Sequence, residues 1–129
     1  MALKKQNNSL HDLIRLEQEA RDFGFDWPDV DMILKQALSE CEEIREAIDN
    51  KESLSRVQEE TGDLLHTAIS LCCYLGFDVE QTLDLTVKKF GARMAALKKA
   101  THEVGLLDLK EQPSDFMLSL WEKAKKNIK

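Results

Sequence analysis

Four acidic side chains, arranged in two pairs, have the residue types and the spacing needed to hold a divalent metal ion. Glu40 and Glu43 are three residues apart, and so are Glu60 and Asp63. Residues three apart in a helix project from nearly the same side, so each pair can reach one ion. Carboxylates that meet at one place repel one another unless cations neutralise them, and hard divalent ions prefer such oxygen ligands. The two pairs therefore indicate a site for hard divalent cations.

The first pair lies at the edge of an apolar stripe. Turning about 100° per residue puts Glu40 and Glu43 beside this stripe, whereas Glu42 and Glu46 lie nearly opposite it. We therefore expect Glu40 and Glu43 to be half-buried. The stripe recurs at intervals of three and four residues, as in an amphipathic helix, and consists of Val30, Ile33, Leu34, Ala37, Leu38, Cys41, Ile44 and Ile48.

The second pair has the same relation to the stripe of the next predicted helix. Glu60 and Asp63 lie beside that stripe, and Glu59 lies farther out. If the two helices are antiparallel neighbours, the four carboxylates meet at the lip of the core. Acidic pairs are also common on exposed helix faces, so solvated pairs without metal are the alternative that the residues alone leave open. The stripe consists of Val57, Leu64, Ala68, Leu71 and Leu75.

A basic pair complements the acids. Lys89 and Arg93 are four residues apart and flank the apolar stripe of a later helix. Mg²⁺ in proteins keeps only one or two carboxylates and fills its other positions with water and phosphate oxygens. Carboxylates together with basic groups therefore suit a phosphoanhydride substrate.

The elements that position these residues are all predicted to be helices. Pro and Gly are scarce, at two and five residues, and helix-forming residues are abundant. Helices are expected from Ser9 to Gly24, over 30–48, from Ser55 to Leu75, from Asp78 to Gly105, and after Pro113, with Ser9 and Ser55 as caps. Short links between them predict an antiparallel bundle of four to five helices, and 129 residues predict one domain over 1–129.

Charge and hydropathy narrow the class of protein. The net charge of -6 argues against a nucleic acid polymer as the partner. No run of eighteen apolar residues predicts a membrane span, and Lys4 and Lys5 are not followed by the apolar segment of a signal peptide. The three cysteines lack the spacing of a zinc site or a disulfide framework. We expect a cytoplasmic protein.

The ordered set of motifs resembles the MazG-type nucleoside triphosphate pyrophosphohydrolases. That family is marked by Glu-Glu-x-x-Glu followed by Glu-x-x-Asp, for which residues 39–43 and 60–63 stand here, after Phe-Asp-Trp-Pro at 25–28. The resemblance continues through Gly62-Asp63-Leu64-Leu65, Leu75-Gly76, the Lys-Phe-x-x-Arg pattern at 89–93, Gly105-Leu106 and Trp121. It covers about residues 20 to 125.

The resemblance implies a helical bundle that dimerises, with tetramers as a further option. It implies hydrolysis of NTP or dNTP to NMP or dNMP and pyrophosphate, through water attack at the α-phosphorus, with Mg²⁺ as cofactor and Mn²⁺ as a substitute. Carried across residue by residue, it makes Lys89 and Arg93 the phosphate contacts and Trp121 a base contact. The implied metal ligands and catalytic acids are Glu40, Glu43, Glu60 and Asp63.

Three positions depart from the family pattern. Ser39 stands where the first Glu of the acidic run is usual, and Ser70 and Val87 stand where Asn is frequent. These departures leave a second function open, namely a MazG-like helical binding or regulatory module with altered catalysis.

A third class, a di-iron carboxylate protein, is suggested by His66, which follows Asp63 by three residues. A packed or surface histidine is the favoured interpretation, because no second histidine completes such a site.

Overall fold

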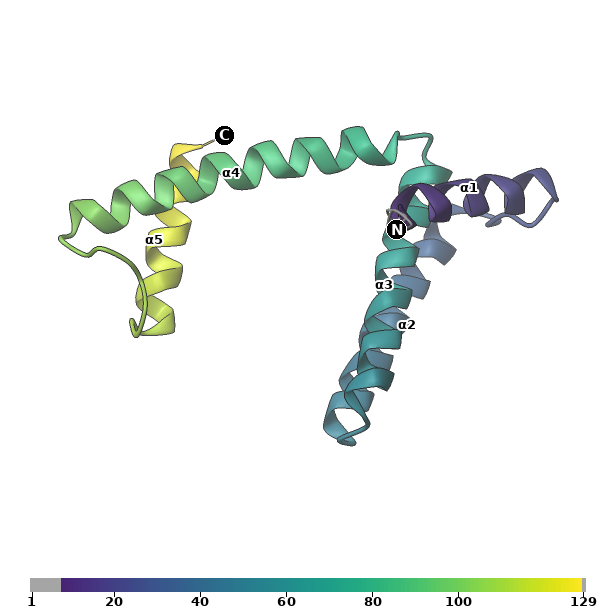
Figure 1. The fold of residues 1–129 in the computed structure, drawn as a ribbon, viewed down its shortest axis with the longest axis horizontal. Helices are drawn as coiled ribbons and strands as arrows, with labels where there is room; N and C mark the ends of the chain where they lie inside the picture. The colour runs from purple at the N-terminus through teal and green to yellow at the C-terminus, as the bar shows by residue number, and fades with distance from the viewer. Residues whose placement is uncertain (1–7, 129) are drawn as a thin grey trace, which may run out of the picture. The chain divides into compact units, whose positions relative to one another are not determined.

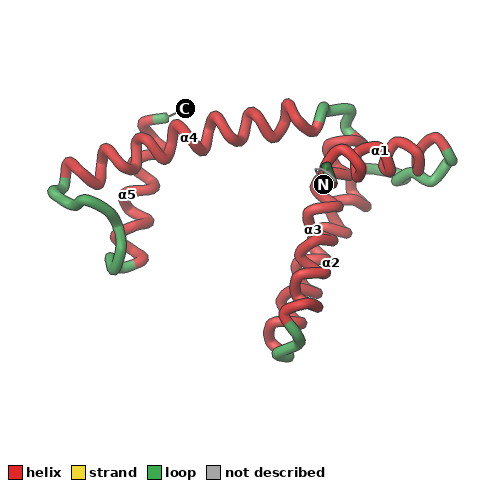
Figure 2. The backbone as a smooth tube through the Cα atoms, in the orientation of Figure 1, coloured by secondary structure: helices red, strands yellow, loops and turns green. Residues whose placement is uncertain are grey.

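The computed structural model describes residues 8–128, and all regular structure in this range is helical (Figure 1; Figure 2). This confirms the predicted all-α class. The segment with Lys4 and Lys5 lies outside the described residues. The helices are α1 (Ser9–Asp22), α2 (Val30–Asp49), α3 (Leu54–Tyr74), α4 (Val79–Glu103) and α5 (Ser114–Asn127).

The chain divides into two compact units, one ending at Val79 and the other beginning at Glu80. The N-terminal unit contains α1, α2 and α3, and the C-terminal unit contains nearly all of α4 and all of α5. A single domain over 1–129 stays a prediction.

Two helices start from a different cap than the sequence predicts. The side chain of Asn8, not Ser9, accepts a hydrogen bond from the backbone N–H of His11 at the start of α1. At the start of α3 the hydroxyl of Ser53, not Ser55, accepts from the backbone N–H of Arg56. In both cases a polar cap residue precedes the predicted one, and the earlier cap lets the helix gain one or two more residues.

Glycines follow the ends of α1 and α3, next to the predicted ends of these helices. Gly24 and Gly76 have φ values of +97° and +79°, which residues with a Cβ rarely adopt. The N–H of Gly24 donates to the carbonyl of Arg21, and the N–H of Phe25 donates to that of Ala20. The same double hydrogen bond closes α3. This geometry ends each helix and turns the chain sharply.

Helices α2 and α3 form an antiparallel pair that runs side by side for most of its length (Figure 1). The turn at residues 50–53 is short, and Ile33 and Ala47 of α2 are each only 1% exposed. Many other large apolar side chains of the pair stay exposed, including Leu38 at 68% and Leu65 at 64%. The pair therefore positions the acidic residues but leaves much of its own apolar surface uncovered.

Helix α1 contacts α3 through the carboxylate of Glu17, which is largely shielded from solvent. Oε1 of Glu17 lies 2.7 Å from Nε2 of His66 and accepts a hydrogen bond from the hydroxyl of Ser70. The side chain of Glu17 is 11% exposed. These contacts join residues about fifty positions apart, and they fix how α1 lies on α3.

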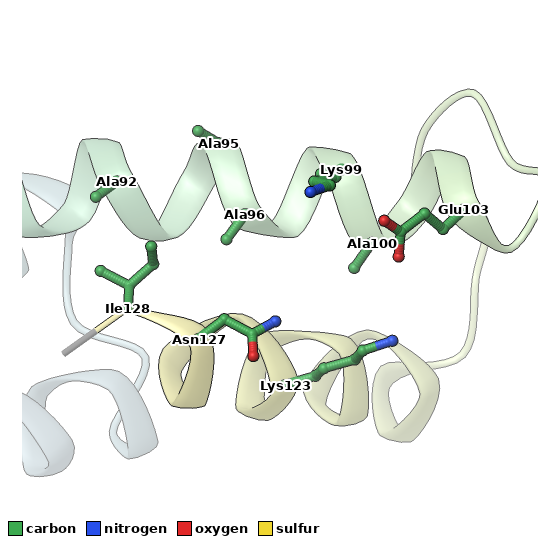
Figure 3. A pocket seen from close by; sticks show the side chains of 9 residues that line it. All are labelled: Ala92, Ala95, Ala96, Lys99, Ala100, Glu103, Lys123, Asn127 and Ile128. Carbon is green, nitrogen blue, oxygen red and sulfur yellow. The ribbon is translucent and has the colours of Figure 1, made fainter.

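In the C-terminal unit, the ring of Trp121 on α5 packs edge-to-face against Phe90 on α4, with centroids 6.1 Å apart. A groove of about 710 Å³ lies between the same two helices (Figure 3). Its α4 wall is mostly alanine, and Lys99 and Lys123 line it as well. The small side chains on α4 leave this space between the helices.

Within residues 8–128, no helix combines the length and the hydropathy that a membrane span requires.

Candidate metal centre

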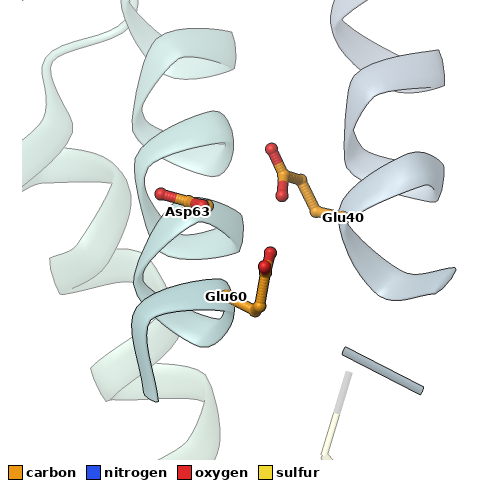
Figure 4. Close-up of side chains that lie close together, drawn as sticks. All are labelled: Glu40, Glu60 and Asp63. Carbon is orange, nitrogen blue, oxygen red and sulfur yellow. The ribbon is translucent and has the colours of Figure 1, made fainter. Parts of the chain in front are cut away.

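Three of the four predicted acids come together between α2 and α3. One carboxylate oxygen each of Glu40, Glu60 and Asp63 lies within 4.8 Å of the other two. Figure 4 shows Glu40 reaching across from α2 toward Glu60 and Asp63 on α3. Within the described part of the chain this is the group of acidic, histidine and cysteine side chains close enough to hold a metal ion. The antiparallel pairing of the two helices produces it, as the stripe-edge positions predict.

Two of these carboxylates are buried, and in each of them one of the two oxygens lacks a hydrogen-bond partner. Glu40 is 7% exposed and Glu60 is 5% exposed. Oε1 of Glu40 accepts from Gln36 at 2.7 Å, and Oε1 of Glu60 lies 2.7 Å from a guanidinium nitrogen of Arg56. The Oε2 atoms of both glutamates are buried without a hydrogen-bond partner. Buried carboxylate oxygens without partners are costly, so this donor set fits a hard divalent cation.

Arg56 and Gln36 are site residues that the motif reasoning missed. Each stands four residues before the acid it contacts, Glu60 and Glu40 respectively, so each pair lies on one helix face. That spacing is the signal in the sequence. Arg56 places one positive charge against Glu60, and Gln36 fixes the orientation of Glu40. Both interactions hold the buried carboxylates in position.

Glu43, the fourth predicted acid, is exposed and not half-buried as predicted. It lies outside the tight cluster, because only Glu40 of this pair reaches between α2 and α3, but it stays within electrostatic reach of the cluster. The pKa of Glu43 is raised above its usual 4.5, and the largest cause is the interaction of its carboxyl with the carboxyl of Glu60. Partial desolvation and the negative charge of Glu40 raise the same pKa further. Neighbouring acids and the loss of solvent both disfavour the negative charge of a carboxyl, so the raised pKa shows that Glu43 interacts with the two buried glutamates.

This raised pKa predicts a pH dependence of stability in the absence of divalent ions. Because the folded state binds the proton of Glu43 more tightly than the unfolded state, stability falls as pH rises through the range just above 4.5. Glu43→Gln removes this titration, so in EDTA its melting temperature should fall less than that of the wild type over this range. Thermal melts of the two proteins at matched pH values measure the difference. Parallel curves for the two proteins would contradict the assignment.

The predicted substrate contacts belong to the C-terminal unit. Lys89 is exposed, and Arg93 is half-buried with its Nε lacking a hydrogen-bond partner. Trp121 is half-buried against Phe90. Lys89, Arg93 and Trp121 therefore stay predicted substrate contacts. The clustered acids belong to the N-terminal unit.

His66 is not part of the acidic cluster. The residues grouped there are all carboxylates, and the His66 ring instead lies 2.7 Å from Glu17 on α1. A di-iron site of the carboxylate-x-x-His kind therefore has no support from the position of His66.

An all-α fold with a cluster of three carboxylates between two antiparallel helices defines a helical protein with a candidate site for an oxygen-ligated cation. The chain belongs to the family described as the MazG nucleotide pyrophosphohydrolase domain, whose pattern matches residues 29–97. The match includes the four acids, Lys89 and Arg93, and it ends before Trp121.

Two relatives carry related names. The chain is 33% identical over 111 residues to the nucleoside triphosphate pyrophosphohydrolase/pyrophosphatase MazG of Thermotoga maritima, covering 86% of this chain and 42% of that protein. It is 24% identical over 139 residues to a nucleoside triphosphate pyrophosphohydrolase of Escherichia coli, covering 97% of this chain and 51% of that protein. The chain thus spans about half the length of the relatives that it matches.

Proposed function

We propose that this chain is a Mg²⁺-dependent nucleoside triphosphate pyrophosphohydrolase, which converts NTP or dNTP to NMP or dNMP and pyrophosphate. The observation that carries the proposal is the convergence of Glu40, Glu60 and Asp63, with two buried oxygens left unpartnered. The names of the relatives and the family support the reaction class.

In this proposal Glu40, Glu43, Glu60 and Asp63 hold Mg²⁺, for which Mn²⁺ can substitute. When bound, the cation screens phosphate charge and makes a water molecule a better nucleophile. Gln36 and Arg56 keep the buried acids oriented while substrate enters and leaves.

The same proposal assigns Lys89 and Arg93 to the phosphates and Trp121 to the base. The positive side chains of Lys89 and Arg93 stabilise the negative charge that builds up on the leaving group. A bond forms between the water oxygen and the α-phosphorus, the bond from the α-phosphorus to the bridging oxygen breaks, and pyrophosphate leaves with that oxygen. No covalent intermediate with the protein is required.

A homodimer, with tetramers as a further state, is part of the proposal. The support is the uncovered apolar surface of α2 and α3, where side chains such as Leu38 and Leu65 are more than half exposed. Light scattering measures this directly, and a pure monomer would contradict it. We place the protein in the cytoplasm, with nucleotides rather than nucleic acid polymers or membranes as partners.

The alternative is a MazG-like binding or regulatory module in which catalysis has changed. Ser70 favours it most specifically, because its hydroxyl is committed to Glu17 on α1 rather than free to contact a substrate.

Pyrophosphate release distinguishes the two functions. A panel of ordinary, deoxy and damaged nucleoside triphosphates is incubated with the protein, with Mg²⁺ or with EDTA. The proposed function predicts release of pyrophosphate and the monophosphate from at least one substrate in Mg²⁺ and none in EDTA. Inactivity across the panel would favour the binding module, and release of phosphate alone would contradict the reaction class.

A further inference from the structure

Each buried glutamate of the acid cluster has one oxygen bound to a donor of its own helix and one oxygen that is open. Gln36 donates to Oε1 of Glu40 at 2.7 Å, and a guanidinium nitrogen of Arg56 lies 2.7 Å from Oε1 of Glu60. In both glutamates Oε2 is buried and has no hydrogen-bond partner within residues 8–128. Each glutamate therefore offers a single open oxygen to a ligand at the cluster (Figure 4).

The helices hold both donors beside their acids. Each donor stands four residues before the acid that it contacts, so donor and acid project from the same face of one helix. The guanidinium group of Arg56 also lies 3.4 Å from Glu59 and 4.0 Å from Glu52. The side chain of Glu60 is only 6% exposed, so little water competes for its contact with Arg56. The two donors therefore keep the Oε1 atoms occupied.

Mg²⁺ and Ca²⁺ differ in how they use the oxygens of a carboxylate. Ca²⁺ takes about six to eight oxygen ligands and often binds both oxygens of one carboxylate. Mg²⁺ is smaller, requires an octahedral arrangement, and combines one or two carboxylates with several water molecules. Glutamates that offer one oxygen each suit Mg²⁺, and the third member of the cluster, Asp63, is exposed and so leaves water access to the site.

We propose that Gln36 and Arg56 set the metal selectivity of the acid cluster. By occupying Oε1 of Glu40 and of Glu60, they prevent these carboxylates from binding a cation through both oxygens, and the site therefore selects Mg²⁺ over Ca²⁺. Both are positioning residues, because they act through the two glutamates. The inference rests on the proposed function, since it takes the cluster as a divalent-metal site.

Binding of the two cations in the absence of nucleotide tests this selectivity. NMR titrations of the isotope-labelled protein with magnesium chloride and with calcium chloride give two Kd values for each variant. Their ratio is compared, because a change in overall charge affects two divalent cations alike. For the wild type we expect tighter binding of Mg²⁺ than of Ca²⁺. Gln36→Leu and Arg56→Leu should each shift the ratio toward Ca²⁺ roughly 10-fold, a typical effect of removing a partner of a metal ligand.

Arg56→Lys should keep the wild-type ratio, because an ammonium group at this position still supplies a donor to Glu60. Gln58→Leu and Arg45→Leu are the matched controls, since both residues are exposed on α3 and α2, and they should also keep the ratio. Circular dichroism melts verify that each variant folds, and Gln36→Leu decides if Arg56→Leu unfolds. Tighter binding of Ca²⁺ than of Mg²⁺ by the wild type, or no shift of the ratio in the folded leucine variants of Gln36 and Arg56, would overturn the inference.

The same data separate this inference from the proposed function. Mg²⁺-dependent release of pyrophosphate by a protein that does not discriminate between the two cations would overturn the selectivity and leave the reaction intact. Selective binding of Mg²⁺ without release of pyrophosphate from any triphosphate would support the selectivity and overturn the reaction.

Discussion

Replacing Glu60 by Gln should reduce Mg²⁺-dependent pyrophosphate release by more than about 100-fold. Changes to groups that merely support a metal ligand cost about 10- to 100-fold in activity or affinity, and Glu60 is proposed as a ligand itself. The amide keeps the size of the side chain but removes the negative charge and one acceptor. Because Oε2 of Glu60 is buried without a partner, no neighbouring side chain replaces it. Initial rates at saturating substrate, measured over a range of Mg²⁺ concentrations, give the comparison.

Glu42→Gln is the control for this experiment. Glu42 is exposed on α2, and the same loss of one charge there should leave the rate within about twofold, as expected for a surface substitution away from the site. If Glu60→Gln kept full activity, the assignment of ligands would be wrong even if the reaction were the one proposed. If both variants lost activity equally, overall charge rather than the acid cluster would be responsible.

The position of the acid cluster could be predicted from the sequence because helical periodicity is strict. Once the stripes of α2 and α3 are recognised, Glu40 and Glu60 are expected beside the core, and the structure finds them 7% and 5% exposed. Glu43 and Asp63 have the same relation to the stripes, yet both are exposed. The glycines that end the helices were equally predictable, since a positive φ at Gly24 or Gly76 suits that residue almost alone.

The roles of neighbours within the cluster were harder to predict. Arg56 and Glu43 both stand at helical spacing from acids of the site, yet many such pairs are solvated surface contacts. The ion pair of Arg56 and Glu60 is partly buried because the Glu60 side chain is buried, and this burial is seen only in the structure. The spacing of the acids predicts the same position beside the core for Glu43 and Glu40. The packing of α2 on α3 instead leaves Glu43 outside the group of Glu40, Glu60 and Asp63.

A cavity beside α1 could not be predicted, because it depends on contacts between distant parts of the chain. Glu17 contacts His66 and Ser70, which are about fifty residues away in the sequence. The periodicity of a helix does not predict such a contact. The connector that carries Trp27 forms one wall of this cavity, together with residues of α1 and α3.

Binding of Mg²⁺ should raise the melting temperature of the folded protein. A ligand that binds only the folded state at a hundred times its Kd adds about 2.7 kcal/mol of stability. For a chain of this size that corresponds to an increase of roughly 10 °C. The physical cause is that the cation neutralises the clustered carboxylates of Glu40, Glu60 and Asp63, which repel one another when it is removed.

Differential scanning calorimetry with Mg²⁺ and with EDTA, on the wild type and on Glu40→Gln, is the most direct test of whether the acids hold a divalent cation. The expected result is a large increase for the wild type that depends on Mg²⁺ concentration, and an increase smaller by more than half for Glu40→Gln. Glu46→Gln, which changes an exposed residue of the same helix, should behave as the wild type. Identical melts in Mg²⁺ and EDTA, or equal increases in the wild type and Glu40→Gln, would contradict the metal centre.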